Sequence, residues 1–599
     1  MGLIQRIGSD YAYLTGILRT LSKITDVAKH PDRTYPQVLR RLAQEHGDRL
    51  ALISDREQMT YRQYDRRGDQ YARWALANGI AKGDVVALMM PNRPEYLAAW
   101  LGITRAGGVV ALLNTNLTGS ALAHCVNIVA PKHVIVDSAL VDAFRTAEGH
   151  LSGKPKLWCH GADAQGFQRL DTELDALPND PVPEEQLPKL NIEDRCLFVY
   201  TSGTTGLPKA ANINHYRVQG IMYAFNAAMK MKASDRVYVC LPMYHTSGGV
   251  LGPGSALTAG ASVVLRERFS SSTFWDDVAK HECTAFIYIG ELCRYLLNSP
   301  PHPKETEHKL RVACGNGLRP DIWLDFKQRF KIPQILEWYA ATEGNCVFVN
   351  FDGKVGAVGR IPNWIKRKFF VEIVRYDLET EEPVRGPEGF CVKCEPGEIG
   401  ETISKIVNDP ARPSQRFEGY SDPGATRSKI LLDVFEKGDR WFRTGDLMKR
   451  DAMGYFYFVD RIGDTFRWKG ENVATSEVSE AITVFPGIRE ANVYGVRIPG
   501  AEGRAGMAAL VVEEDLDLDG FSRHVREQLA VYARPAFLRI CREIETTSTF
   551  KQRKLDLVEQ GFDPGKTGDP IFFLHPERGT YVLLDESIHG EISRGGLRL

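Results

Sequence analysis

The stretch from Leu197 to Ala210, LFVYTSGTTGLPKA, joins a short apolar run to a loop rich in hydroxyls and glycine. The apolar residues at its start predict a buried strand. Besides backbone N–H groups, including those of Gly203 and Gly206, the loop offers the side chains of Thr201, Ser202, Thr204, Thr205 and Lys209. Such donors hold phosphate oxygens, and the spacing of a Walker loop is absent. We therefore expect a phosphate site of another kind; the alternative is a plain Ser/Thr/Gly connection.

The segments on both sides of this loop alternate between apolar strands and helices. Helical patterns cover 35–47, 61–78 and 94–107. Apolar runs typical of buried strands occupy 50–54, 85–90, 109–114, 133–137, 236–242, 262–265, 286–290 and 335–340. Strands and helices in alternation predict parallel sheets covered by helices, so the fold class is α/β.

The character of the chain changes twice towards its C-terminus. Near residue 365 shorter strands separated by turn signals begin, which predicts a small antiparallel subdomain. Beyond 461–464, two helices and two strands suffice for a small α+β domain. We predict an extension at 1–34, a large domain at 35–460, a hinge at 461–464 and a C-terminal domain at 465–599 whose tail, after residue 575, is irregular.

Composition excludes several classes of protein. The chain of 599 residues has 75 basic and 76 acidic residues, and this balance argues against a nucleic-acid partner. The eleven cysteines follow no disulfide or zinc spacing, which favours the reduced cytoplasm. Arg6, Asp10 and Arg19 interrupt the apolar N-terminus, so we expect an amphipathic surface helix there, with peripheral contact to the inner face of a membrane, and no signal peptide. The uncharged stretch 237–265 contains proline and many glycines, which predicts a buried loop, helix and strand.

Further motifs follow the loop in a familiar order. They are LPMYHTSG at 241–248, CGNGL at 314–318, WYAATE at 338–343, GEIG at 397–400, FRTGD at 442–446 and Asp460-Arg461. Together with the loop, they resemble the adenylate-forming superfamily of acyl-CoA synthetases, luciferases and peptide-synthetase adenylation domains. The segment FVDRIGDTFRWKGENVAT at 458–475 resembles its fatty acid transport protein and very-long-chain acyl-CoA synthetase branch.

The resemblance implies a site for ATP. Glu343 would hold Mg²⁺ against the phosphates with the hydroxyl of Thr342 beside it, or it caps a helix. Asp446 and Arg461 would bind the ribose, or they form a surface ion pair. The adenine slot would be shaped by Gly315, Asn316, Gly317, Tyr339 and Ala340, with small residues giving the base room against the backbone.

The resemblance also implies which lysine is catalytic. The segment TTSTFK at 546–551 aligns with the terminal motif of the superfamily, which makes Lys551 the catalytic cation. Phe550 stands where a glycine is usual, and Lys554 is the rival. His245, with Gly248, matches the position that gates the acyl pocket, and a histidine satisfied within the core is the alternative.

The activity implied is a ligase that uses ATP, Mg²⁺ and coenzyme A to convert a fatty acid into an acyl adenylate and then a thioester. Between the two steps the C-terminal domain would swing about Gly463, where relatives carry Asp or Lys. Lys469, Gly470 and Glu471 would then line the channel for the pantetheine arm. Three alternatives stay open: transfer to a carrier protein, a fatty-acid uptake or binding protein with weak or vestigial ligase function, and a luciferase-like oxygenase.

Overall fold

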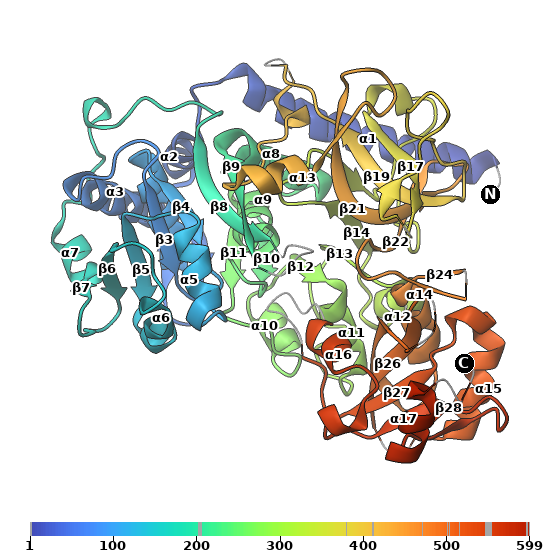
Figure 1. Ribbon diagram of the computed structural model, residues 1–599. Coiled ribbons are helices and arrows are strands. Elements are labelled where there is room, and N and C mark those ends of the chain that lie inside the picture. Colours follow the sequence, from blue (N-terminus) through green and yellow to red (C-terminus); the bar gives the residue numbers. More distant parts are fainter. Residues whose placement is uncertain are drawn as a thin grey trace.

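Figure 1 shows the computed structural model of the chain. It describes residues 3–201, 207–378, 380–409, 412–469, 471–499, 501, 503–513, 516–545, 554–594 and 597, and for 3–5, 472 and 555 the backbone alone. The predicted α/β class is confirmed, because the chain forms two large and mainly parallel sheets, a third antiparallel sheet and a separate C-terminal sheet.

The first large sheet has seven strands, and its order places the loop of the opening motif at one edge. The order is β7 (Gln168–Arg169), β6 (Lys156–His160), β5 (His133–Asp137), β3 (Val85–Met89), β4 (Val109–Leu112), β8 (Arg195–Thr201) and β9 (Lys209–Asn214). All neighbours are parallel except β8 and β9, where Thr201 lies opposite Lys209. The loop therefore joins two antiparallel strands. Its residues Ser202, Gly203, Thr204, Thr205 and Gly206 lie outside the described residues.

The second large sheet has eight strands in the order β15 (Val347–Val349), β14 (Gln334–Ala340), β13 (Val312–Asn316), β12 (Ala285–Ile289), β10 (Arg236–Val239), β11 (Ser262–Leu265), β1 (Leu50–Ile53) and β2 (Gln58–Thr60). It is parallel apart from its two edge pairs. The predicted loop, helix and strand within 237–265 are confirmed, since a π-turn at Ser247–Leu251 and helix α9 (Gly252–Leu257) separate β10 from β11.

Helices cover both large sheets, and one lies wholly inside. They are α2 (Tyr35–His46), α3 (Tyr61–Ala77), α4 (Pro94–Arg105), α5 (Gly119–Asn127), α6 (Val141–Glu148), α7 (Leu170–Ala176), α8 (His215–Ala228), α10 (Phe274–Lys280), α11 (Gly290–Asn298) and α12 (Pro320–Arg329). Every residue of α4 is buried, as expected of a helix that is apolar on most sides. One core cluster contains side chains of both large sheets, which fixes them as a unit.

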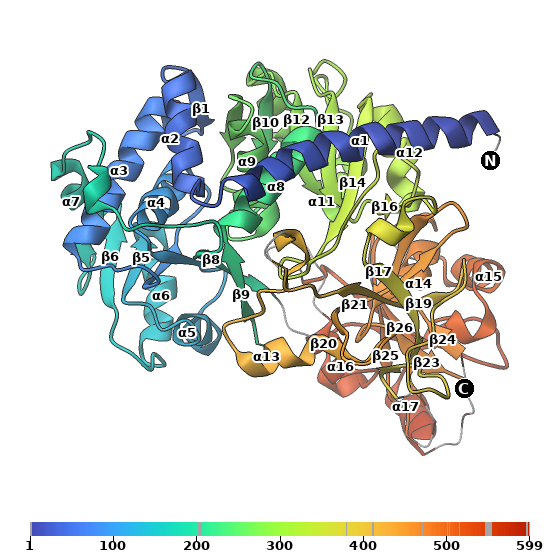
Figure 2. The ribbon, with the colours of Figure 1, turned by 90° about the horizontal axis from the view of Figure 1, so that it is seen from above.

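The antiparallel sheet predicted beyond residue 365 is present. Its order is β16 (Gly359–Arg360), β22 (Tyr455–Arg461), β21 (Arg440–Arg450), β19 (Ile399–Lys405), β17 (Val371–Asp377) and β18 (Glu382–Pro383), with β20 (Ile430–Leu432) on β21. The short helix α13 (Pro423–Ser428) lies beside β9 (Figures 1 and 2). The strands β21 and β22 pair so that Asp446 lies opposite Arg461.

The C-terminal part has its own sheet and its own core. After the hairpin β23 (Phe466–Trp468) and β24 (Glu471–Val473) come the strands β25 (Ile488–Val496), β26 (Ala505–Val512), β27 (Phe537–Cys541), β28 (Ile571–Leu574) and β29 (Tyr581–Leu583). Helices α14 (Thr475–Thr483), α15 (Leu518–Gln528), α16 (Leu555–Gln560) and α17 (Glu586–Ser593) belong to the same part.

The prediction of an irregular tail after residue 575 was wrong. Strand β29 extends the C-terminal sheet and α17 follows it. The reason is tertiary: Tyr581 and Ile592 are buried in the core of this part, and a three-residue strand has too little alternation to be seen in the sequence.

The predicted surface helix at the N-terminus is also present. Helix α1 (Leu3–Lys29) packs against α8 and lies across the outside of the molecule, as Figure 2 shows. No helix in the part of the chain that the structure describes is both long and apolar enough to cross a bilayer.

Candidate functional site

The two strands of the opening motif present Thr201 and Lys209 to a tyrosine from the antiparallel part of the chain. Strand β9 pairs with the segment around Gly419–Ser421, since the N–H of Asn212 donates to the carbonyl of Gly419 (3.0 Å) and Ala211 bridges to Tyr420. The Nζ of Lys209 lies 5.9 Å from the centre of the Tyr420 ring. The side chain of Thr201 hydrogen-bonds to Tyr420.

Tyr420 links this pair to Glu343. Its hydroxyl donates to Oε1 of Glu343 at 2.5 Å. Burial raises the pKa of Tyr420, and the carboxylate of Glu343 raises it further, so the hydroxyl stays protonated and remains a donor. Thr201 and Lys209 of the opening motif therefore meet Glu343, which lies more than 130 residues further along the chain, around one phenol.

An arginine that sequence reasoning missed holds the loop of Glu343 in place. The guanidinium group of Arg217, on α8, donates to three successive carbonyls: those of Thr342 (2.8 Å), Glu343 (3.3 Å) and Gly344 (2.6 Å). Burial lowers the pKa of Arg217 and the charge of Glu343 opposes that shift. A planar fork of five N–H donors suits several acceptors at once.

The resemblance implies that Glu343 holds Mg²⁺ in a reaction that releases pyrophosphate. On that expectation, replacing Arg217 with methionine should displace Glu343 and raise the Mg²⁺ concentration needed for half-maximal pyrophosphate release. Hydrogen bonds from charged donors contribute about 1.5–3 kcal/mol each, so we expect a rise of roughly 10- to 100-fold. Arg217→Lys should need a Mg²⁺ concentration between those of the native chain and Arg217→Met, because one ammonium group cannot donate to all three carbonyls in this geometry. Titration of Mg²⁺ against released pyrophosphate measures the effect.

Arg236 provides a matched control for this prediction. Its side chain is also partly buried and donates to a carbonyl, that of His281 at 2.9 Å, away from Glu343. Arg236→Met should leave the Mg²⁺ dependence unchanged. Equal shifts in both variants would show that Arg217 acts through general stability.

The predicted ribose residues lie together on the hairpin of β21 and β22. Nε of Arg461 is 3.8 Å from Oδ1 of Asp446. The hydroxyl of Tyr339, at the end of β14, donates to Oδ2 of Asp446. Burial and the neighbouring carboxylate raise the pKa of Tyr339, so it remains a donor. The structure thus brings Tyr339 to Asp446, although the sequence suggested it only for adenine.

The predicted adenine residues form a tight turn after β13. A Cβ at Gly290 would lie 1.6 Å from the carbonyl oxygen of Gly317, and Gly317 has a φ of +81°. Both positions require glycine. Among the described residues, no hydrogen-bond partner reaches the buried Oδ1 of Asn316. Ala340 ends β14 next to Tyr339. The turn therefore offers an unused acceptor and little side-chain bulk.

Glu337, also missed from the sequence, fixes this turn from inside. Its carboxyl accepts hydrogen bonds from the N–H groups of Gly317 and Leu318, the latter at 3.2 Å. It also accepts a hydrogen bond from the hydroxyl of Tyr288. Its position on a buried strand gave no signal of this role. Burial raises the pKa of Glu337 to about 8 from an ordinary 4.5.

Because the folded pKa of this acid is raised, its contribution to the free energy of unfolding is largest below about pH 4.5 and falls as the pH rises towards about 8. Glutamine has the shape of the neutral acid and no ionisation. Glu337→Gln should therefore melt at a higher temperature relative to the native chain as the pH is raised from 5.5 to 7.5, judged by thermal denaturation. A constant difference across this range would contradict the raised pKa.

The segment that carries His245 is held by Asn92. The side chain of Asn92 donates to the carbonyl of Leu241 (2.8 Å) and accepts from the N–H of Met243 (2.8 Å). His245 is partly buried, its ring centre 4.7 Å from that of Tyr244. A Cβ at Gly248 would lie 2.4 Å from the carbonyl oxygen of Pro242, so no other residue fits there.

At the junction to the C-terminal part, Lys554, the alternative to Lys551 as catalytic lysine, has partners of its own. Nζ of Lys554 donates to the hydroxyl of Thr475 (2.8 Å) and lies 3.5 Å from Asp464. Thr475 in turn donates to Asp460 from both its N–H (2.6 Å) and its hydroxyl (2.9 Å). Lys551 lies outside the described residues.

The predicted hinge and channel residues lie on this junction and the hairpin after it. Gly463 has a φ of +137°, which disfavours other residues although nothing lies within 4 Å of the position that a Cβ would take. Lys469, at a φ of +53°, and Glu471 are exposed at the turn between β23 and β24. Gly470, between them, lies outside the described residues.

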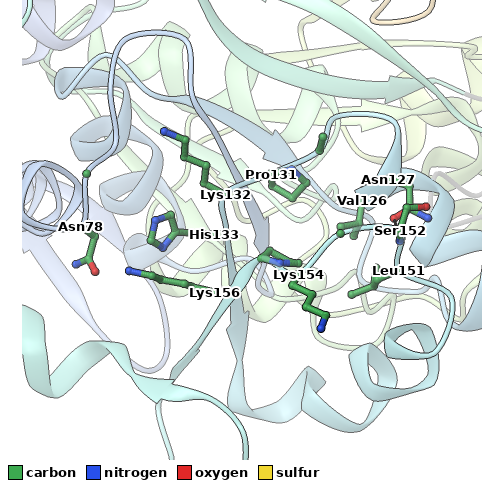
Figure 3. Close-up of a pocket in the computed structure, with 14 residues that line it drawn as sticks. Asn78, Val126, Asn127, Pro131, Lys132, His133, Leu151, Ser152, Lys154 and Lys156 are labelled. Carbon is green, nitrogen blue, oxygen red and sulfur yellow. Dashed lines mark hydrogen bonds between the residues drawn. The ribbon is translucent and has the colours of Figure 1, made fainter.

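A depression of about 580 Å³ lies elsewhere, at the amino-terminal ends of β5 and β6. Lys132, Lys154 and Lys156 line it, but Figure 3 shows their ammonium groups pointing in different directions. Lys132 is paired with Asp84 at 2.5 Å. This depression has no converging charges and lies apart from the residues described above.

Comparison with known proteins decides the family. The model of the AMP-binding enzyme family matches residues 39–401, and that of the AMP-binding enzyme C-terminal domain matches residues 477–551. The chain belongs to the AMP-binding enzyme family. In this AMP-binding enzyme the first model covers both large sheets, and the second lies within the C-terminal part.

Long-chain fatty acid transport proteins are among the curated relatives of this chain. Long-chain fatty acid transport protein 1 of Mus musculus is 42% identical over 575 residues, which cover 94% of this chain and 88% of the relative. Long-chain fatty acid transport protein 2 of Rattus norvegicus is 40% identical over 582 residues, covering 95% and 92%.

Solved structures share the fold. An anthranilate CoA ligase in complex with anthranoyl-AMP has a TM-score of 0.74 at 20% identity, over 88% of this chain and 96% of that one. A fatty acyl CoA synthetase of Mycobacterium tuberculosis has a TM-score of 0.60 at 24% identity, over 88% and 99%.

Proposed function

We propose that this AMP-binding enzyme is a long-chain or very-long-chain fatty acid:CoA ligase that releases AMP and pyrophosphate. The observation that carries the proposal is the meeting of Thr201, Lys209 and Glu343 around Tyr420, together with the pairing of Asp446 and Arg461. Asp446 accepts from Tyr339, which stands four residues before Glu343 in the chain. We propose that the first group, around Tyr420, binds the phosphates of ATP and that the second, Asp446 and Arg461, binds its sugar. The names of the relatives at about 40% identity support a long acyl chain.

In the first half-reaction, the carboxylate of the fatty acid attacks the α-phosphorus of ATP and pyrophosphate leaves with the bonding electrons. Expulsion of oxide from a free carboxylate is prohibitive, whereas AMP is a competent leaving group. Negative charge gathers on the phosphates in the transition state, where Thr201, Lys209 and Lys551 are proposed to stabilise it. The carboxylate is itself the nucleophile, so no enzyme nucleophile is needed.

Glu343 fits a magnesium site by its chemistry. A carboxylate oxygen is a hard donor of the type that Mg²⁺ prefers. The side chain is 8% exposed, and Tyr420 and Arg217 fix its position. We assign Glu343, with Thr342 beside it, as the residues that hold the ion, which would supply positive charge against the phosphates.

The proposed nucleotide contacts follow from the same geometry. Asp446 would accept from both ribose hydroxyls and Arg461 would donate to the sugar. The adenine would lie against Gly315, Gly317, Tyr339 and Ala340, with its amino group donating to Oδ1 of Asn316. Two observations support these contacts: among the described residues no donor reaches the buried Oδ1 of Asn316, and Gly317 has a positive φ in the turn.

In the second half-reaction, the thiol of coenzyme A attacks the acyl carbon and AMP leaves. We propose that the part of the chain from residue 465 pivots about 461–464, with Gly463 absorbing the backbone rotation. Lys469, Gly470 and Glu471 would then line the path of the pantetheine arm. The positive φ of Gly463 supports this placement.

The acyl chain is proposed to enter beside His245 and Gly248. The region behind this segment is apolar and tightly packed. Tyr35, Trp100, Met222 and Leu257 lie around it, and the space between them is too small to hold a water molecule. Met222 is an unbranched, adaptable side chain of the kind that can make room for an apolar guest.

We place the activity in the cytoplasm, at the inner face of a membrane. All eleven cysteines are thiols, ten of them buried, as is usual for proteins of a reducing compartment.

Mass spectrometry of the products tests the function. Purified protein is given ATP, Mg²⁺ and a ladder of fatty acids, with and without coenzyme A. We expect acyl-CoA and AMP only when coenzyme A is present, with the yields giving the chain preference. Acyl-AMP that accumulates in both conditions would favour transfer to a carrier protein. The absence of any product would favour a binding protein, and light with a luciferin would favour the oxygenase.

A further inference from the structure

Helix α1 has apolar side chains on two opposite faces, and only one of them is covered by the protein. Tyr13 and Val27 are buried, and Tyr13 packs edge-on against Phe351 with ring centres 6.1 Å apart. On the opposite face, five large apolar side chains are 38–69% exposed: Ile7, Tyr11, Leu14, Leu18 and Leu21.

The exposed residues form a continuous stripe. Their spacings of four, three, four and three residues place them along one side of a helix of 3.6 residues per turn. Figure 2, which looks onto this side of the molecule, shows α1 lying across it with no other element over the helix. Single exposed apolar residues are common on proteins, but a continuous row of five is not.

The stripe is also free of charge. The only charged residues between Ile7 and Leu21 are Asp10 and Arg19, and both are engaged with the body of the protein. Asp10 pairs with Arg360 at 2.7 Å, and Nε of Arg19 donates to the carbonyl of Ala227 at 2.6 Å. Asp10 and Arg19 thus attach the covered face of α1 to the rest of the protein. The opposite, exposed face remains apolar.

Beside α1 lies an exposed tryptophan followed by cations. Trp364 is 55% exposed although its ring contacts Tyr13, with centres 6.5 Å apart. Three and four residues further on, Arg367 and Lys368 are exposed. Aromatic rings at a polar–apolar boundary together with nearby lysine and arginine are typical of helices that lie in a membrane interface.

We propose that this face, formed by the α1 stripe and the segment Trp364–Lys368, docks on an anionic phospholipid membrane with α1 parallel to the surface. The apolar stripe enters the boundary between headgroups and acyl chains, and the cations contact lipid phosphates and carboxylates. A second copy of the chain is the competing occupant, because the same spacing suits a helix pair. A two-fold contact through this face would bring two sets of the same cations together, which favours the lipid.

Flotation of the full chain with vesicles tests the proposal independently of ligase activity. We expect binding to vesicles of phosphatidylcholine with phosphatidylserine, and weaker binding to phosphatidylcholine alone. Leu14→Glu/Leu18→Glu should reduce binding to the mixed vesicles by at least about tenfold, given the cost of exposing a leucine and adding a charge. Arg367→Glu/Lys368→Glu should reduce it several-fold on the anionic vesicles alone and should weaken its dependence on salt.

Leu583→Glu is the matched control. Leu583 and Leu18 are both 57% exposed, but Leu583 lies on β29 in the C-terminal part. It should bind vesicles like the native chain. The milder Ile7→Gln/Tyr11→Gln pair serves if the glutamate variants melt at a lower temperature than this control.

Two results would overturn the proposal. One is vesicle binding by the stripe variants equal to that of the Leu583 control. The other is a dimer in lipid-free solution that the stripe variants dissociate while vesicle binding is retained, which would assign the face to a second copy.

Discussion

Replacing Lys551 with alanine is expected to reduce formation of the acyl adenylate by about 100- to 1,000-fold, the usual cost of removing one donor aimed at transition-state charge. The thioester half-reaction, started from preformed acyl-AMP and coenzyme A, should keep its rate. The reason is that attack at the α-phosphorus, where Lys551 is proposed to stabilise the developing charge, occurs only in the first half-reaction. Release of pyrophosphate and formation of acyl-CoA, measured separately, give the two rates.

Lys554→Ala is the matched control, since Lys554 is three residues away and contacts Thr475 and Asp464 at the junction. This variant should affect both half-reactions by a similar, smaller factor, because it loosens the junction on which both depend. A selective loss of adenylate formation in Lys554→Ala, with Lys551→Ala unaffected, would transfer the catalytic role to Lys554. Equal loss of both half-reactions in Lys551→Ala would also contradict the assignment.

Replacing Asp446 with alanine should raise the KM for ATP by about 100-fold or more, since hydrogen bonds to a charged acceptor contribute about 1.5–3 kcal/mol each and the carboxylate is proposed to accept two. The variant should also lose its discrimination against 2′-deoxy-ATP and 3′-deoxy-ATP. The native enzyme should use both analogues poorly, because each leaves one carboxylate oxygen without its donor. Steady-state kinetics with the three nucleotides measure the difference.

Tyr339→Phe separates the ribose contact from the support of Asp446. It removes the hydroxyl that donates to Oδ2 and keeps the ring. We expect a smaller rise in KM for ATP and retained discrimination between ATP and the deoxy analogues. If Asp446→Ala still discriminates like the native enzyme, Asp446 does not bind the ribose.

Most of the scaffold could be predicted from local patterns. Long apolar runs such as Val85–Met89 and the wholly buried helix Pro94–Arg105 need few tertiary contacts to be recognised, because their periodicity and length already exclude other structures. Short elements could not be predicted, because their patterns are too brief to exclude other structures. Strand Tyr581–Leu583 exists because its side chains complete a core built from distant residues.

The residues of the candidate site likewise fall into those that local patterns predicted and those that they did not. Motifs in which several polar residues stand close in sequence, such as the loop that begins at Thr201, allowed a phosphate site to be predicted. Tyr420, Arg217 and Glu337 could not be predicted, because each is a single residue whose partners lie on other elements. Their roles depend on hydrogen bonds to Glu343, to the carbonyls of residues 342–344 and to the turn at Gly317.

The sequence by itself determined the α/β class, which follows from periodicity. It also determined the motifs and their order, which carry the resemblance to the family, because each motif consists of near neighbours in the chain. Only the tertiary structure decided that Tyr420 joins Thr201 and Lys209 to Glu343, that Tyr339 supports Asp446, and that one apolar face of α1 is covered while the other is not. The physical reason is that burial and hydrogen bonding between residues far apart in sequence depend on how whole helices and strands pack. A local sequence pattern does not show which distant residues will lie close together in space.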